Sequence, residues 1–139
     1  SYLDDGAPVA FSGTAPRGPG FWLAPTVLGP VANTDRPARE EIFGPIACVI
    51  PFEGEAEAVA LANDTPYGLS GSVWTRDGAK ALRVARAIDT GVLSINSNTS
   101  VRVSTPFGGF KQSGVGRELG PHALDHYTEV KNVYYATGG

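Results

Sequence analysis

Two segments far apart in the chain combine residue types that suit the binding of a nucleotide and of an apolar substrate. Residues 40–45 read Glu-Glu-Ile-Phe-Gly-Pro, and residues 106–114 read Pro-Phe-Gly-Gly-Phe-Lys-Gln-Ser-Gly. In the first segment the Glu41 carboxylate can accept hydrogen bonds from two vicinal hydroxyls, and the Phe43 ring can lie against a ribose or a planar base. The alternative interpretation is a solvated acidic turn beside a core phenylalanine.

The single cysteine is the only thiol that could serve as a nucleophile. Cys48 lies in the apolar run Ile-Ala-Cys-Val-Ile at 46–50, which predicts a buried strand in which a thiol behaves as a small hydrophobe. A reactive cysteine needs partial exposure and a positive environment. We therefore expect Cys48 to have a packing role, and one cysteine excludes an intrachain disulfide.

Three other patterns imitate known sites. The glycines at 114, 116 and 120 imitate a dinucleotide fingerprint, but Leu119 holds the position of the third glycine and no strand directly precedes them. Residues 68–72 miss the nucleophile elbow of hydrolases by one position. His122 and His126 have helical spacing with Asp125 nearby, which is the minimum for a metal site, yet such pairs are common by chance. We expect no metal.

Together, the segments at 40–45 and 106–114 resemble the NAD(P)-dependent aldehyde dehydrogenases. The resemblance runs from about Gly20 to Tyr135 and covers only the carboxyl-terminal part of such an enzyme. In that family a cysteine attacks the aldehyde carbon, a glutamate acts as general base, and a separate Rossmann-like domain holds most of the dinucleotide. The family's glycine-glutamine-x-cysteine setting for the nucleophile occurs nowhere in this sequence, so the resemblance implies no catalytic nucleophile in this chain.

The resemblance assigns roles to four residues. It implies that Glu41 and Phe43 contact the nicotinamide ribose of NAD or NADP, and that Phe107 lines the aldehyde tunnel. Glu118 resembles an acid that assists proton movement in some members. For Phe107 a place in the core stays open, and for Glu118 an ion pair or a helix N-terminal position does. Glu40 is expected to face solvent or to pair with Arg36 or Arg39.

Composition narrows the class of partners. The net charge of -3 and the isoelectric point near 5.3 argue against non-specific binding to nucleic acid or to anionic membranes, which require a positive surface. No apolar run approaches the roughly 20 residues that span a bilayer, and residues 1–10 lack the blocks of a signal peptide. We expect a cytoplasmic protein that acts on a small aldehyde.

Strands and helices are expected to alternate after a loop-rich beginning at 1–20. Asp35 is expected to cap a helix over 36–42 that Gly44 and Pro45 stop, and Asp77 to cap a helix that ends near Gly91. The remaining expected elements are an irregular or edge strand at 21–28, strands at 46–52, 70–75 and 92–95, helices at 54–63 and 117–127, and a strand at 129–135.

This alternation predicts an α/β fold, with a mainly parallel sheet joined by crossover helices. We divide the chain into a partial catalytic domain, residues 1–128, and a C-terminal oligomerisation strand with its tail, residues 129–139. In the family, the terminal strand extends the sheet of a neighbouring subunit, so the resemblance implies a homo-oligomer.

Three functional hypotheses follow. The favoured one is the distal part of an aldehyde dehydrogenase, which would be inactive by itself. The alternatives are an oligomerisation element and a nucleotide-binding module without catalysis of its own; NAD titration of the isolated chain would separate the last from the first. The polarity of residues 96–100, where the family varies its substrate loop, hints at a polar aldehyde.

Overall fold

The structure is a computed structural model, and it describes residues 6–138. The chain divides into two units, the first ending at Thr65 and the second beginning at Pro66. Helices and strands alternate along both, and two of the strand pairs are parallel. The predicted α/β class is confirmed. In the described residues the strands form three small sheets, two of which contain a parallel pair.

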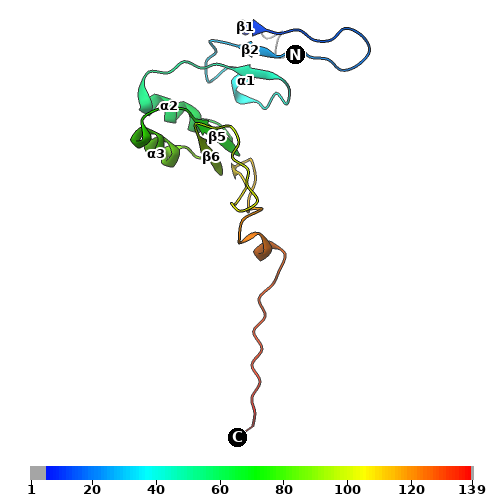
Figure 1. The fold of residues 1–139 in the computed structure, drawn as a ribbon, viewed down its shortest axis with the longest axis vertical. Helices are drawn as coiled ribbons and strands as arrows, with labels where there is room; N and C mark the ends of the chain where they lie inside the picture. Colours follow the sequence, from blue (N-terminus) through cyan, green and yellow to red (C-terminus); the bar gives the residue numbers. More distant parts are fainter. Residues whose placement is uncertain (1–5, 139) are drawn as a thin grey trace. The chain divides into compact units, whose positions relative to one another are not determined.

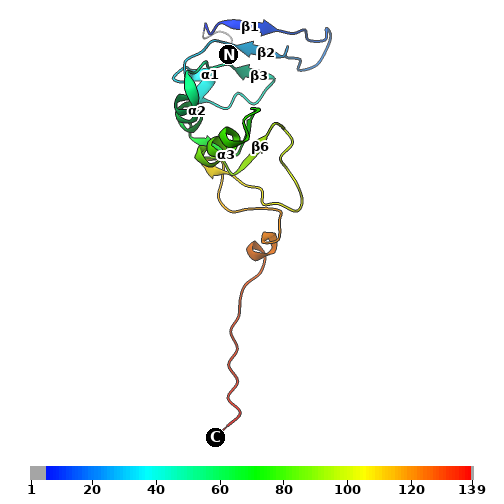
Figure 2. The ribbon, with the colours of Figure 1, turned by 60° about the vertical axis from the view of Figure 1, so that its left-hand side comes forward.

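The first unit is built on a three-stranded sheet (Figure 2). The central strand β2 (Thr26–Leu28) runs antiparallel to β1 (Val9–Ser12) and parallel to β3 (Ile46–Cys48). The Leu28 side chain is 0% exposed and Val31 is also buried, because both lie on the inner strand or directly after it. The irregular region predicted at 21–28 therefore contains the best-buried strand of this unit.

Two helices complete the first unit. Helix α2 (Gly54–Asn63) has the predicted bounds, with Glu55 and Glu57 in its first turn, where acidic side chains favour the helix dipole. Helix α1 (Arg36–Arg39) is shorter than predicted, since Glu40 is already extended. The expected cap is also wrong: the Asp35 side chain accepts from the Ala32 N–H at 2.8 Å rather than from the helix.

The second unit contains the predicted strand–helix–strand element. Strands β5 (Ser70–Val73) and β6 (Val92–Ile95) are parallel, and helix α3 (Gly78–Ala87) connects them (Figure 1). As predicted, the Asp77 side chain caps α3, accepting from the Lys80 N–H at 3.0 Å. Helix α3 buries Ala81.

At the ends of β5 and β6, the Asn96 amide accepts from the Thr75 N–H and donates to the Thr75 carbonyl, both at 2.9 Å. This amide therefore has its partners within the backbone, which weakens its part in the argument for a polar aldehyde. The Ser97 hydroxyl accepts from the Thr99 N–H at 3.0 Å, and the Thr99 hydroxyl donates to the Asn98 amide oxygen at 3.3 Å.

The glycine-rich segment is ordered by pairing with a distant segment of the chain, which the sequence did not indicate. Strand β7 (Phe110–Lys111) pairs antiparallel with β4 (Tyr67–Gly68). The helix predicted over 117–127 is wrong, and only the 3-10 turn η1 (Ala123–His126) forms there. Leu119 and Gly120 both have positive φ, 58° and 68°, which ends any helix that starts at residue 117.

The strand predicted at 129–135 is likewise not formed within this chain: residues 128–138 have no regular secondary structure and are exposed. Their backbone groups thus have no strand partner among residues 6–138. Within the same range, no helix has the length and apolar character needed to cross a membrane.

Candidate functional site

The two adjacent glutamates, Glu40 and Glu41, differ in their contacts. Glu40 accepts from the Arg36 Nε at 3.2 Å across one turn of α1, which confirms the predicted pairing. Glu41 lies outside the helix, in a segment without regular secondary structure, contrary to the expectation of a helix end, and it is exposed. Both residues are therefore exposed, and the Glu40 carboxylate also pairs with Arg36.

Phe43 is held in an unusual conformation. Its φ is 52°, in the left-handed region, and 91% of its surface is exposed. An L-residue there costs roughly 1–2 kcal/mol, and exposure of the ring gains no burial energy in return. Strain of this kind persists where a ligand or a further part of the protein makes use of it.

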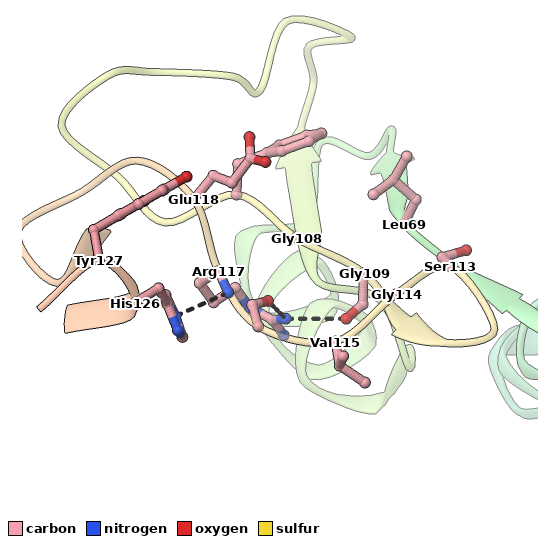
Figure 3. A pocket seen from close by; sticks show the side chains of 12 residues that line it. Leu69, Gly108, Gly109, Ser113, Gly114, Val115, Arg117, Glu118, His126 and Tyr127 are labelled. Atoms are coloured by element: carbon pink, nitrogen blue, oxygen red, sulfur yellow. Dashed lines mark hydrogen bonds between the residues drawn. The ribbon is translucent and has the colours of Figure 1, made fainter. Parts of the chain in front are cut away.

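The second candidate region is a pocket of about 320 Å³ formed by the glycine-rich segment (Figure 3). Phe107 and Glu118 stand opposite each other in an isolated antiparallel bridge. Phe107 is half-buried, which fits both predicted alternatives, a wall of the tunnel and a residue of the core. Glu118 is exposed. The other lining residues are Leu69, Gly108, Gly109, Ser113, Gly114, Val115, Gly116, Arg117, His126 and Tyr127.

Arg117 holds the two sides of this pocket together. Its Nη1 donates to the Gly109 carbonyl at 3.0 Å and to the Gly116 carbonyl at 2.6 Å (Figure 3). Its guanidinium also lies 5.3 Å from the centre of the Phe110 ring, within the range of a cation–π contact. One side chain thus connects two stretches of backbone and an aromatic ring.

Arg117 and Glu118 are neighbours that project to different sides. Successive side chains of extended backbone alternate, and in Figure 3 the Glu118 carboxylate points away from the Arg117 guanidinium. The alternative of an ion pair for Glu118 finds no partner among the ion pairs of residues 6–138. The alternative of a helix N-terminal acid is excluded, because no helix begins there.

Glycines allow the backbone to approach itself closely around the pocket. A Cβ on Gly91, at the start of β6, would lie 1.7 Å from the Gly108 carbonyl oxygen. A Cβ on Gly108 would lie 2.5 Å from the Gly116 carbonyl oxygen. Real Cβ atoms cannot approach so closely, so these positions exclude any larger residue unless the backbone moves.

Cys48 is half-buried rather than fully buried, but its environment does not favour a thiolate. Its Sγ donates to the Pro37 carbonyl at 3.3 Å. Burial raises the pKa of the Cys48 thiol above its usual range, and the negative charge of Asp35 raises it further. A nucleophilic cysteine requires the opposite shift.

The two histidines have separate partners. His122 Nδ1 lies 3.2 Å from the Asp125 carboxylate, whereas His126 Nε2 lies 3.4 Å from the Arg117 backbone N–H, so that His126 would accept that bond. Within residues 6–138, no group of three His, Cys, Asp or Glu side chains is placed to hold a metal ion.

Sequence reasoning missed Arg117 and Gly91. The contacts of Arg117 are backbone carbonyls, which leave no mark in the residue types. Gly91 was interpreted only as a helix stop, although it stands between α3 and the predicted strand, where an isolated glycine also signals close backbone approach.

Comparison with known proteins identifies the family. A family model described as "Aldehyde dehydrogenase family" matches residues 2–133. The chain belongs to the aldehyde dehydrogenase family. An aldehyde dehydrogenase of Emericella nidulans is 44% identical over 133 residues, and a betaine aldehyde dehydrogenase of Agrobacterium fabrum is 46% identical over 145 residues. These alignments cover 96% and 99% of this chain but only 27% and 29% of the relatives.

Solved aldehyde dehydrogenases give the same result. A Mycobacterium tuberculosis aldehyde dehydrogenase in complex with NAD+ matches with a TM-score of 0.87 and 42% identity, over 99% of this chain and 29% of that one. A P. syringae indole-3-acetaldehyde dehydrogenase mutant in complex with NAD+ matches with a TM-score of 0.86 and 44% identity, over 93% and 26%. The chain therefore spans less than a third of the aldehyde dehydrogenases it matches.

Proposed function

We propose that this chain is the carboxyl-terminal part of an NAD(P)-dependent aldehyde dehydrogenase that oxidises an aldehyde to a carboxylic acid. Membership of the family supports the reaction class, and the NAD+ complexes of the matched structures support the cofactor. The share of 27–29% of each relative supports the view that the nucleophile and most of the dinucleotide site belong to the rest of the enzyme. By itself the chain is inactive.

The observation that carries the proposal is the conformation of the segment 41–43. An exposed carboxylate and an exposed ring held in the left-handed region fit a ribose better than they fit a free surface turn. Glu41 accepts hydrogen bonds from the ribose hydroxyls, and Phe43 lies against the sugar or the nicotinamide. The nicotinamide, when bound, supplies the acceptor for the hydride.

In the second unit the chain contributes a wall to the aldehyde site. Half-buried Phe107 lines the pocket of Figure 3, which is also lined by the apolar residues Leu69 and Val115. Such a wall excludes water and orients an aldehyde without reacting with it. Glu118, exposed beside it, is placed to exchange a proton with a water molecule.

Cys48 takes no part in the chemistry of this proposal. Its raised pKa leaves little thiolate near neutral pH, and its hydrogen atom is engaged by the Pro37 carbonyl. The cysteine that attacks the aldehyde therefore lies outside the chain.

A second contribution, to assembly, has its own observation. The segment 129–135 carries apolar side chains that are almost fully exposed, with Val130 at 102%, Tyr134 at 87% and Tyr135 at 81%. Full burial of one side chain such as valine contributes roughly 1.5–3 kcal/mol, so a neighbouring subunit that covers this segment would be strongly favoured. We therefore infer a homo-oligomer in which these residues add a strand to a neighbour's sheet.

The test of the proposed reaction is NADH formation by the whole enzyme with a panel of aldehydes, compared with the variant Phe107→Ala. Turnover that requires NAD+ or NADP+, with a raised KM for the aldehyde in the variant, is expected. The proposal fails if no aldehyde is oxidised, and the role of Phe107 fails if the variant has the wild-type KM.

A further inference from the structure

We propose that Arg117 is a positioning residue for the aldehyde pocket: by tying the Gly109 and Gly116 carbonyls together it fixes the placement of Phe107 and so sets the affinity for aldehyde. The inference rests on the proposed function, because it takes Phe107 as a wall of the substrate site. The Arg117 guanidinium is engaged by these two carbonyls and by the Phe110 ring, so its effect on the aldehyde passes through the pocket wall.

The first step is that the glycines of the pocket wall have no side chains that could fix its shape. Gly108, Gly109, Gly114 and Gly116 carry no Cβ, and two of them have positive φ, 132° at Gly114 and 82° at Gly116. Glycine backbone loses more conformational entropy on ordering than any other residue. A fixed shape here therefore requires contacts made by a neighbouring side chain.

The second step is that Arg117 makes those contacts at both sides of the pocket. Nη1 donates at 3.0 Å to the carbonyl of Gly109, in the segment that leads to Phe110, and at 2.6 Å to that of Gly116, the residue directly before Arg117. Hydrogen bonds from a charged donor are stronger than neutral ones. The guanidinium plane 5.3 Å from the Phe110 ring keeps the side chain in this orientation.

The third step connects the contacts to Phe107. Arg117 directly precedes Glu118, whose backbone is bridged to that of Phe107. Gly109, whose carbonyl accepts from Arg117, lies two residues after Phe107. The bridge and the guanidinium contact thus close a small ring of backbone around the pocket. Without the guanidinium the segment 108–117 gains freedom, and Phe107 loses its fixed place.

The expected consequence is selective. Aldehyde affinity should fall, because Phe107 is in the same ring of contacts, whereas NAD+ affinity should change little, because the proposed ribose contacts Glu41 and Phe43 belong to the other unit of the chain. A purely structural role for Arg117 would instead lower the amount of folded enzyme without this selectivity. The informative quantity is therefore the change in aldehyde affinity divided by the change in NAD+ affinity.

The test uses the whole enzyme with Arg117→Gln, Arg117→Lys and Arg117→Ala. The matched control is Arg86→Gln, an exposed arginine in the last turn of α3 in the same unit. The expected result is a KM for aldehyde raised on the order of tenfold in Arg117→Gln, from the loss of charge-assisted hydrogen bonds. Arg117→Lys should be intermediate, since lysine keeps the charge but not the planar fork. The KM for NAD+ should stay within about twofold of wild type.

Two further readouts separate positioning from folding. Added guanidinium ion should lower the aldehyde KM of Arg117→Ala and leave Arg86→Gln unaffected. Amide hydrogen exchange in residues 107–118 should be faster in Arg117→Gln than in wild type, with or without substrate.

Two results would overturn the inference while leaving the proposed function intact: a wild-type aldehyde KM in Arg117→Gln, or an equal rise of both KM values without guanidinium rescue. A wild-type enzyme that oxidises no aldehyde would overturn the proposed function and the inference together. The hydrogen-exchange result distinguishes that case, because it reports on the Arg117 contacts without turnover.

Discussion

Phe107 and Glu118 donate their backbone N–H groups to each other's carbonyls, both at 2.7 Å. This reciprocal pair is the point at which the two sides of the glycine-rich segment meet. It brings together two residues that the sequence singled out for different reasons, one as a substrate wall and one as an acid. Because only backbone groups form the bridge, it fixes the backbone of Phe107 and Glu118 and does not engage their side chains.

The backbone at Gly91 closely approaches the Gly108 carbonyl, next to the bridged Phe107, and a small substitution tests this approach. Gly91→Ala should destabilise the second unit by about 1–3 kcal/mol, because the new methyl group would lie 1.7 Å from a backbone oxygen that cannot turn aside. Gly71→Ala is the control, since its Cβ would meet only a Thr90 methyl group at 4.0 Å. Thermal unfolding of the two variants checks this, and equal melting temperatures would contradict the close approach.

Glu41→Gln in the whole enzyme should slow hydride transfer more than it weakens overall NAD+ binding. The amide loses the charge that strengthens acceptance from the ribose hydroxyls, worth roughly 1.5–3 kcal/mol for a hydrogen bond to a charged group, or about tenfold to a hundredfold in rate. Single-turnover NADH formation measures it. Glu40→Gln serves as the control because Glu40 pairs with Arg36, and an equal rate for Glu41→Gln and wild type would show a solvated turn.

The cap of α3 predicts a pH dependence. The Lys80 backbone N–H is the main cause that lowers the pKa of Asp77 in the folded state. A lowered folded pKa means that the stabilisation is present above the unfolded value of about 3.9 and is lost as the pH falls through the folded pKa. The protection factors of amides in the first turn of α3, which correct for the intrinsic pH dependence of exchange, should fall over that range. In Asp77→Asn, which keeps the acceptor but does not titrate, this fall should be absent.

The exposed C-terminal segment predicts self-association of the isolated chain. Val130, Val133 and Tyr135 leave apolar surface uncovered, and such surface drives association. Light scattering should show a mass that grows with concentration, and Val133→Lys should reduce it by adding a charge to the segment. A monomer that persists on dilution, with protected amides at 130–135, would mean that the strand completes its own domain.

Elements with strong local signals were predictable from sequence. Helix α2 has the predicted bounds because its alanines and acidic first turn act locally, and α3 has the predicted cap because Asp77 needs only its own next turn. Strand β6 followed from a short, mainly apolar run after a glycine. The two helices depend on no distant part of the chain, whereas β6 also needs its partner β5.

The remainder depends on contacts that residue types do not report. Helix α1 stops at Arg39 because Glu40 becomes extended and its side chain turns back to Arg36, although the pattern was helical to residue 42. The helix expected from Arg117 does not form, because Leu119 and Gly120 have positive φ and the Arg117 side chain bonds to the Gly109 carbonyl, eight residues earlier. The strand expected at 129–135 finds no strand partner among residues 6–138.

The candidate site was predicted as residue identities but not as geometry. The exposure of Glu41 and Phe43 agrees with the roles that the family resemblance implies, which stay predictions. The left-handed backbone of Phe43 was not foreseen, because phenylalanine rarely adopts it and only the following Gly-Pro turn hints at a reversal.

The most direct test of the central claim is NADH formation from aldehydes, measured for the isolated 139-residue chain, for the whole enzyme and for the whole enzyme with Cys48→Ser. Since burial and Asp35 raise the pKa of the Cys48 thiol, we assign the nucleophile to another part of the enzyme. We predict no turnover by the isolated chain and equal turnover by the whole enzyme with or without the Cys48 thiol. Turnover by the isolated chain that Cys48→Ser abolishes would contradict it.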